Sequence, residues 1–344
     1  MNETLDLEKP IDVNKNFKNK KGLCGLKNLG NTCFMNAILQ CLSNTHPLLE
    51  YMMSLDYVSD VNYEKDDRLI VDEWFIVLRH LWYKNSTYSP NNFLKIVHSL
   101  CEKKNYDEFT GMRQSDSHEF LQFFLETMHN ATCKEVNMDI TGIVKNDFDK
   151  LAVEAFKNYK NFFKNDYSKI INIFYGQFST IIKTQKNNKL DISRTFEPFN
   201  ILTLEICNKN IYDCLDNFSD IEKIDTEDKS ISKTKEVKFW SLPNILIIML
   251  KRFDNLLNKI NISVDFPIDN LDMRKYITGY NRSSYTYKLY AVANHLGGVG
   301  GGHYYACVRN DDNNWYKYND HVVSTMKVNE IISNNAYCLF YSKH

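Results

Sequence analysis

The sequence has few residues that punctuate structure and no excess charge of either sign. It holds 12 glycines and 6 prolines in 344 residues. No linker rich in glycine, proline or serine marks a boundary between domains after residue 21. The 42 Lys and Arg residues balance the 43 Asp and Glu residues, which gives a formal net charge of −1. Because this balance lacks the basic footprint of nucleic-acid binding, we expect no nucleic-acid partner.

A long hydrophobic run is missing as well. Residues 1–21 are polar and rich in Lys and Asn, which is typical of a flexible N-terminal segment and not of a signal peptide. The longest strongly apolar run, residues 242–250, covers half a bilayer and contains Pro243. The sequence therefore predicts neither a membrane span nor a membrane partner.

Disulfide and zinc patterns are also missing. None of the nine cysteines forms a Cys-x-x-Cys pair, and an odd number does not suit a disulfide framework. This pattern favours reduced thiols, and so an intracellular protein of the cytoplasm, the nucleus or both.

Hydrophobic periodicity divides the chain into two halves. Helical spacing is found in residues 34–42, 74–82, 93–100 and 119–128, whereas short β-branched or aromatic runs follow at 244–250, 285–293, 303–308, 315–318 and 336–341. A helical N-terminal half followed by a strand-rich C-terminal half predicts an α+β fold.

One cysteine lies where a helix should begin. The segment GLKNLGNTCFMN is a polar turn that leads into a buried helix, with Asn31 or Thr32 as the N-cap and Cys33 in the first turn. Free backbone amides and the helix dipole favour the thiolate, so we expect Cys33 to be a nucleophile with a lowered pKa. The alternative is a structural cysteine, which is what most buried cysteines are.

A nucleophilic cysteine needs a base, and His303 opens the strand at 303–308. A five-residue loop joins this strand to the one at 315–318. A hairpin centred on Asp312 would place Asn319 on the face of His303 and Asp320 on the opposite face. A slip of one residue would exchange the two, and both could be ordinary turn residues.

Several motifs together resemble those of a known family. GLKNLGNTCFMNAILQCL, from Gly25, resembles the cysteine box of the ubiquitin-specific proteases, which are papain-like deubiquitinating enzymes. The histidine box is matched by YKLYAVANH from Tyr287, GHYYA from Gly302 and WYKYNDHVVS from Trp315. The family's intermediate signatures follow in order as QSDSHEFL from Gln114, EPF from Glu197, LPNIL from Leu242 and LKRF from Leu250.

The resemblance implies a papain-like cysteine protease with thumb, palm and fingers, formed by one catalytic domain at residues 22–344. It implies hydrolysis of the isopeptide or peptide bond after the C-terminal glycine of ubiquitin through a thioester intermediate. The implied partners are ubiquitin and ubiquitinated proteins. Two alternatives remain: a pseudoenzyme that binds ubiquitin without cutting it, and an enzyme for another ubiquitin-like modifier.

The resemblance also implies roles for single residues. Cys33 attacks the carbonyl carbon, His303 transfers the proton, and Asn319 orients the imidazole with Asp320 alongside it. Asn28 corresponds to the side chain of the oxyanion hole, although on its own it would be a turn residue.

A further group of residues matches the channel for the arginine-bearing tail of ubiquitin. Asp116 would bind this tail, with Glu119 in the same motif, although the two also fit a capping pattern at a helix start. Tyr304 and Phe253 match residues that line the channel, and Phe253 fits a core aromatic equally well.

The clearest departure from the family concerns zinc. Many relatives carry two Cys-x-x-Cys pairs in the fingers, where this chain has Thr184 and Asn187 in place of the first pair. Hydroxyl and amide groups do not replace thiolates on zinc. We therefore expect no metal and no cofactor, and a short fingers hairpin that is held by packing alone.

Overall fold

The computed structural model describes residues 22–84, 86–111, 113–187, 189–228, 230–298 and 301–344. The segment 1–21, predicted to be flexible, lies outside the described residues. The chain divides into two compact units, of which the first comprises residues up to 133 together with 303–328, and the second comprises 134–302 together with 329–344.

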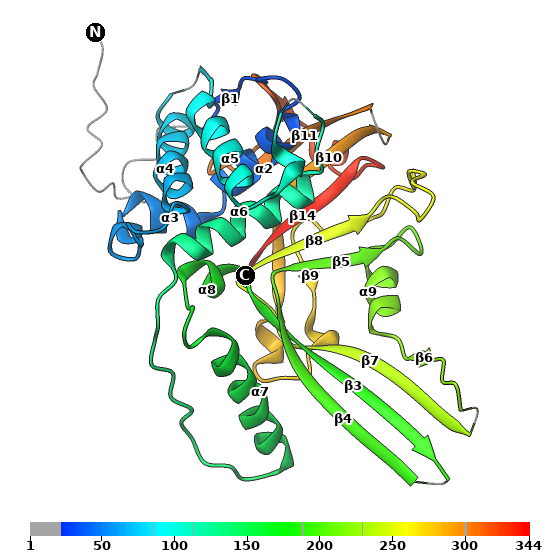
Figure 1. Ribbon diagram of the computed structural model, residues 1–344. Coiled ribbons are helices and arrows are strands. Elements are labelled where there is room, and N and C mark those ends of the chain that lie inside the picture. Colours follow the sequence, from blue (N-terminus) through cyan, green and yellow to red (C-terminus); the bar gives the residue numbers. More distant parts are fainter. Residues whose placement is uncertain (1–21, 85, 112, 188, 229, 299–300) are drawn as a thin grey trace. The chain divides into compact units, whose positions relative to one another are not determined.

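Helices make up most of the first unit (Figure 1). They are α2 (Cys33–Ser43), α3 (His46–Met53), α4 (Arg68–Tyr83), α5 (Asn91–Lys103) and α6 (Ser117–Thr132). Every residue of α2 is buried, as its apolar residues on all sides predicted. The helix packs against α3 and α6, and the Phe34 ring meets the edge of the Phe120 ring at 5.6 Å between centroids. The nucleophile candidate therefore begins a helix that packing holds on all sides.

Short strands complete this unit. β1 (Gly25–Leu26) pairs in parallel with β2 (Thr87–Tyr88). β11 (Gly301–Arg309), β12 (Trp315–Asn319) and β13 (Val322–Met326) follow one another as antiparallel strands. Since β12 also contacts α2, residues about 280 positions apart in the sequence meet in one unit.

The second unit contains two sheets (Figure 1). In the first, the strand order is β10 (Thr286–Gly298), β14 (Ala336–Lys343), β8 (Ile245–Lys251) and β5 (Ile201–Glu205), with β9 (Leu271–Asp272) beside β10. β5 runs parallel to β8, and the other pairs are antiparallel. The second sheet has the order β4 (Lys189–Phe199), β3 (Gly176–Lys186), β7 (Ile231–Ser241) and β6 (Glu222–Ile224).

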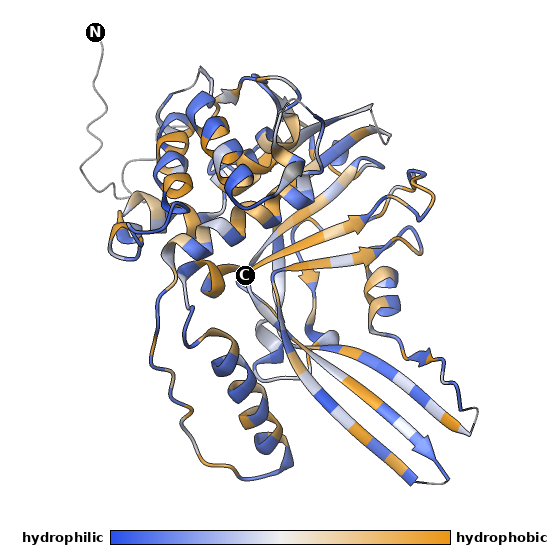
Figure 2. Ribbon diagram, in the orientation of Figure 1, coloured by the Kyte–Doolittle hydropathy of each residue, from blue (hydrophilic) through white to orange (hydrophobic). Residues whose placement is uncertain are grey.

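The strands of these two sheets differ in their hydropathy pattern. β8 is almost continuously hydrophobic, whereas hydrophobic and hydrophilic residues alternate along β3, β4 and β7 (Figure 2). Continuous hydrophobicity is typical of a strand buried on both faces, and alternation is typical of a sheet with one solvated face. β8 is correspondingly buried except at Met249 and Lys251.

Three helices accompany the sheets of the second unit: α7 (Asp147–Phe163), α8 (Lys169–Phe174) and α9 (Ile211–Ser219). α7 packs on β4, and its Ala152 and Ala155 join Phe196 and Trp240 in a small core. The α+β fold and the predicted helices and strands are thus confirmed, but α7 and the length of the strands β3, β4 and β7 were not predicted.

Candidate active site

A hydrogen-bonded turn precedes Cys33. The side-chain oxygen of Asn28 accepts bonds from the backbone amides of Gly30 and Thr32, each at 3.1 Å. Gly30 and Asn31 have positive φ angles of 102° and 57°, which glycine and asparagine tolerate better than most residues. Thr32 occupies the N-cap position, but its side chain does not cap the helix. The turn is held mainly by Asn28.

Cys33 is the first residue of α2, and its side chain is 4% exposed. Burial raises the pKa of its thiol, and the Asp320 carboxylate raises it further. The backbone amide of Tyr304 donates to the sulfur and opposes this shift, as do the amides at the helix start. The prediction of a lowered thiol pKa is therefore wrong for the free protein, because burial outweighs the amides that face the sulfur.

His303 is paired with Asn319 across the β11–β12 hairpin. The imidazole Nε2 lies 2.5 Å from the side-chain oxygen of Asn319. Ala306 pairs with Tyr318, and Cys307 pairs with Lys317, which is the register predicted from the sequence. The residue after His303 donates its backbone amide to the Cys33 sulfur, so the hairpin also brings the imidazole-bearing strand to the thiol.

Asp320 faces the turn before α2. Its carboxylate oxygens accept bonds from the side-chain amides of Asn28, at 3.0 Å, and Asn36, at 2.8 Å. Its backbone carbonyl accepts from the amide of Leu26 at 2.9 Å, and its φ of 51° lies in the left-handed region. Asp320 therefore anchors the turn that carries the nucleophile, while Asn319 contacts the histidine.

Sequence reasoning missed Asn36. It is 2% exposed, and it lies one helical turn after Cys33 in a helix that is otherwise mainly apolar. A polar side chain at such a position needs a buried partner, and this was the available signal. The structure supplies Asp320 as that partner.

Asp116 is the N-cap of α6. Its Oδ1 accepts from the amide of His118 at 2.6 Å and from that of Glu119 at 3.4 Å, so the predicted capping role is confirmed. Its Oδ2 accepts from the Tyr304 hydroxyl at 3.4 Å. Asp116 and Tyr304, two of the predicted tail-binding residues, are therefore in contact.

Two carboxylates, those of Glu119 and Glu108, lie beside Asp116. Burial raises the pKa of Glu119 to about 7, and a hydrogen bond and the charge of Glu108 add to the shift, as does the charge of Asp116. Two carboxylates this close disfavour simultaneous ionisation, so that the pair titrates as a unit.

Phe253 belongs to the second unit. Its ring meets the edge of the His295 ring at 5.6 Å between centroids, and its side chain is half-buried. It is thus a packed aromatic residue, and it does not belong to the unit that holds the other predicted site residues.

The fingers region differs from the prediction. Its strands β3, β4 and β7 are each 11 residues long, so the prediction of a short hairpin is wrong. Thr184 pairs with Asp191 on β4 and with Lys233 on β7. Antiparallel pairing joins the three strands along their length, with one register shift between β3 and β7 at Gln177 and Phe178. Among the described residues, no three His, Cys, Asp or Glu side chains form a group that could hold a metal ion.

No helix in the described part of the chain is both long enough and apolar enough to cross a membrane.

Comparison with known proteins shows the family to which the chain belongs. The family model described as ubiquitin carboxyl-terminal hydrolase matches residues 24–341. The bovine protein named ubiquitin carboxyl-terminal hydrolase 2 is 32% identical over 95% of this chain and 56% of its own length, and a Drosophila melanogaster protein, ubiquitin carboxyl-terminal hydrolase Usp2, is 30% identical over 94% of this chain and 35% of its own length. The chain thus spans about half the length, or less, of these curated relatives.

Solved structures share the fold. A chain of the yeast SAGA DUB module has a TM-score of 0.72 and 25% identity, with 94% of this chain and 69% of that chain covered. A chain of the SAGA DUB module bound to monoubiquitin has a TM-score of 0.72 and 24% identity, with 94% and 70% covered. On the family match across nearly all of its length, the chain belongs to the ubiquitin carboxyl-terminal hydrolase family, the ubiquitin-specific proteases that its motifs resemble.

Proposed function

We propose that residues 22–344 form the catalytic domain of a cysteine-type deubiquitinase, which hydrolyses the isopeptide or peptide bond after the C-terminal glycine of ubiquitin. One observation carries the proposal. The sulfur of Cys33, at a helix start, accepts a hydrogen bond from the backbone amide of Tyr304. The residue before Tyr304 is His303, which is hydrogen-bonded to Asn319. Nucleophile, base and orienting group are the components that acyl transfer needs.

The reaction begins with a neutral thiol, because burial raises the pKa of Cys33. His303 takes the thiol proton as the sulfur attacks the carbonyl carbon of the terminal glycine. The proton then passes to the departing amine as the C–N bond breaks, which leaves a thioester. Water attacks the thioester and gives a proton to His303, and this proton returns to the sulfur as the carboxylate leaves.

Asn28 and the backbone amide of Cys33 would stabilise the oxyanion. A side-chain amide carries two N–H donors, and one of those on Asn28 is used by Asp320 at 3.0 Å. Its oxygen is held by two backbone amides of the turn, which fixes the plane of the amide group. The second N–H is thereby oriented before the substrate arrives, as preorganised stabilisation requires.

Asp116, Glu119, Tyr304 and Phe253 would bind the arginine-bearing tail of ubiquitin. One carboxylate oxygen of Asp116 caps the helix and the other accepts a hydrogen bond from the Tyr304 hydroxyl, so the carboxylate is fixed in orientation. Fixed carboxylates bind guanidinium groups well, because both partners are planar and both lose little freedom.

Ubiquitin and ubiquitinated proteins are the proposed partners. The SAGA DUB module bound to monoubiquitin supports this by similarity of fold. We further propose an intracellular location, in the cytoplasm, the nucleus or both, since all nine cysteines are free thiols.

A ubiquitin derivative with an electrophile at its C-terminus tests the proposal. Mass spectrometry of the intact protein should find one covalent adduct, and peptide mapping should assign it to Cys33. Cys33→Ala should form no adduct, and Cys41→Ala should form it at the normal rate, because Cys41 is a buried cysteine later in the same helix. An unmodified wild-type protein that still binds ubiquitin would instead indicate a non-catalytic binder.

Other ubiquitin-like modifiers that carry the same C-terminal electrophile test which modifier is the substrate. Faster labelling by one of them than by ubiquitin would reassign the enzyme to that modifier.

A further inference from the structure

The second unit contains two neighbouring thiols that the proposed reaction does not use. Cys207 is exposed and lies in the connection between β5 and α9, whereas Cys214 is buried on α9 and 1% exposed. The two side chains are in hydrogen-bonding contact. An exposed thiol that contacts a buried one is the arrangement in which a first oxidation is followed by closure within the same molecule.

The backbone around the pair is already ordered. The carbonyl of Lys209 accepts from the amide of Asp265 at 2.6 Å, and the amide of Ile211 donates back to the carbonyl of Asp265 at 2.9 Å. Asn210 caps α9 by accepting from the amide of Tyr212 at 2.8 Å. Because folding has fixed the connection and the helix start, joining the two sulfurs costs little additional ordering.

A buried guanidinium lies close to the inner thiol. The Nε of Arg252 donates to the carbonyl of Ala336 at 2.8 Å, while its Nη2 has no hydrogen-bond partner among the described residues. Arg252 is 1% exposed, and its charge interacts with the Cys214 side chain. The inner thiol thus has a buried cation among its neighbours.

We propose that Cys207 and Cys214 are a site of reversible disulfide formation by exchange with a low-molecular-weight disulfide such as oxidised glutathione. The Cys207 thiolate attacks one glutathione sulfur and releases one glutathione thiolate, which forms a mixed disulfide. The Cys214 thiolate then attacks the Cys207 sulfur and expels the second glutathione. Two protein thiols and one glutathione disulfide thus give one protein disulfide and two glutathione thiols.

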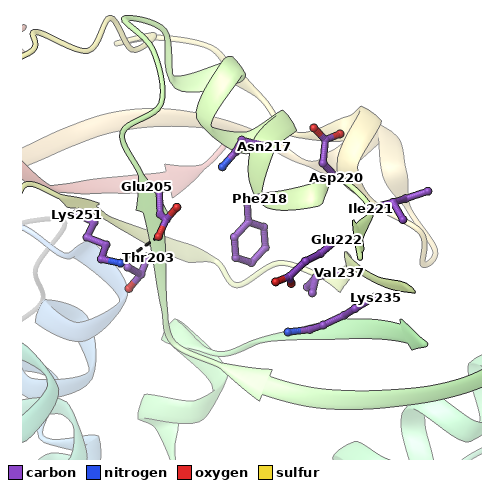
Figure 3. Close-up of a pocket in the computed structure, with 10 residues that line it drawn as sticks. All are labelled: Thr203, Glu205, Asn217, Phe218, Asp220, Ile221, Glu222, Lys235, Val237 and Lys251. Carbon is purple, nitrogen blue, oxygen red and sulfur yellow. Dashed lines mark hydrogen bonds and ion pairs between the residues drawn. The ribbon is translucent and has the colours of Figure 1, made fainter. Parts of the chain in front are cut away.

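The disulfide would restrain the segment that joins two sides of a neighbouring pocket. This pocket, of about 630 Å³, lies between β5, α9, β6 and β7, with Asn217 and Phe218 of α9 on one side and Thr203 and Glu205 of β5 on another (Figure 3). The Cys207 connection joins these two sides. We therefore expect oxidation to slow hydrogen exchange in residues 206–215, because the connection and the helix can then no longer separate.

The rate at which Cys207 forms the mixed disulfide should rise with pH. Partial burial and the Cys214 thiol raise the pKa of Cys207, and the charge of Asp213 adds to the shift. The attacking thiolate is therefore scarce near neutral pH and becomes more abundant above it.

The test equilibrates the full-length chain in glutathione buffers of increasing oxidised fraction, followed by acid quenching, alkylation under denaturing conditions and peptide mapping. In the wild type we expect a Cys207–Cys214 disulfide and little glutathione on Cys207. In Cys214→Ser, glutathione should accumulate on Cys207 by about tenfold or more, because the displacing thiol is gone. Cys207→Ser, at an exposed position, should leave Cys214 reduced.

Equal glutathionylation of Cys207 in the wild type and in Cys214→Ser would overturn the proposal. If Cys214→Ser fails to fold, the wild type alone decides, since Cys214 that remains open to alkylation under oxidising buffers contradicts the disulfide. Cys133, a half-exposed thiol of the first unit, provides an internal comparison for mixed-disulfide formation.

Discussion

The side-chain amide of Asn36 donates a hydrogen bond to one carboxylate oxygen of Asp320 at 2.8 Å, and the side-chain amide of Asn28 donates to the other oxygen at 3.0 Å. The three residues connect the middle of α2, the end of the β12 hairpin and the turn before Cys33. A buried amide in the helix thus sets the position of the proposed oxyanion donor without touching the substrate.

This relationship predicts the effect of Asn36→Ala. We expect kcat to fall roughly 10- to 100-fold with little change in KM, because Asp320 and through it Asn28 lose their anchor. Gln40→Ala is the matched control, since Gln40 is a buried amide of the same helix that donates to the Cys24 carbonyl at 2.9 Å. Both variants should lose about 1–3 kcal/mol of unfolding free energy. An equal loss of kcat in the two would assign Asn36 a structural role only.

Asn319 should matter through the oxygen that faces His303. Asn319→Ala is expected to lower kcat on the order of 10²–10⁴-fold, because the imidazole loses its orienting partner. Asn319→Asp keeps an acceptor oxygen and should stay within about tenfold of the wild type. Steady-state kinetics on a ubiquitin–fluorophore conjugate measures both. Near-normal turnover by Asn319→Ala would contradict the proposed role.

The pH dependence of Cys33 alkylation should reveal the charge of Asp320. Burial and this carboxylate both raise the thiol pKa, so Asp320→Asn removes one cause and should move the alkylation profile to lower pH. The wild-type midpoint should lie above the value of about 8.5 for a free thiol. Asp311→Asn is the control, because Asp311 lies in the β11–β12 turn and pairs with His46. A profile that does not move would exclude Asp320 as a cause.

The affinity for substrate should depend on whether the Glu119 carboxyl group is protonated. The pKa of Glu119 is about 7, so the side chain is largely protonated below that pH and charged above it. An arginine-bearing tail binds the charged form better, and KM should therefore fall as pH rises through about 7. Glu108→Gln removes the main neighbouring cause and should move this change to lower pH, with a KM difference of about three- to tenfold below neutrality. Glu126→Gln, at an exposed position of α6, should leave the profile unchanged.

Sequence patterns predicted the parts of the site that depend on local periodicity. The all-apolar spacing after Cys33 predicted a buried helix, and the length of the loop around Asp312 predicted the hairpin register that puts Asn319 on the face of His303. Both rest on short-range geometry, which sequence carries directly.

Features that depend on the balance of long-range effects could not be predicted in this way. The direction of the Cys33 pKa shift depends on how fully the thiol is buried and on the carboxylate of Asp320, far away in the sequence. Asn36 acquires its role only when the hairpin is folded beside α2. The length of the strands β3 and β4 depends on their pairing with each other and with β7.

The position of β14 has a consequence for biosynthesis. This strand follows every other described strand in the sequence, yet it lies between β10 and β8. During translation those two strands emerge first, and each presents an open edge to other chains until residues 336–343 leave the ribosome. A nascent or prematurely terminated polypeptide is thus exposed to aggregation, and the sheet can close only after almost the whole of this sequence has been synthesised.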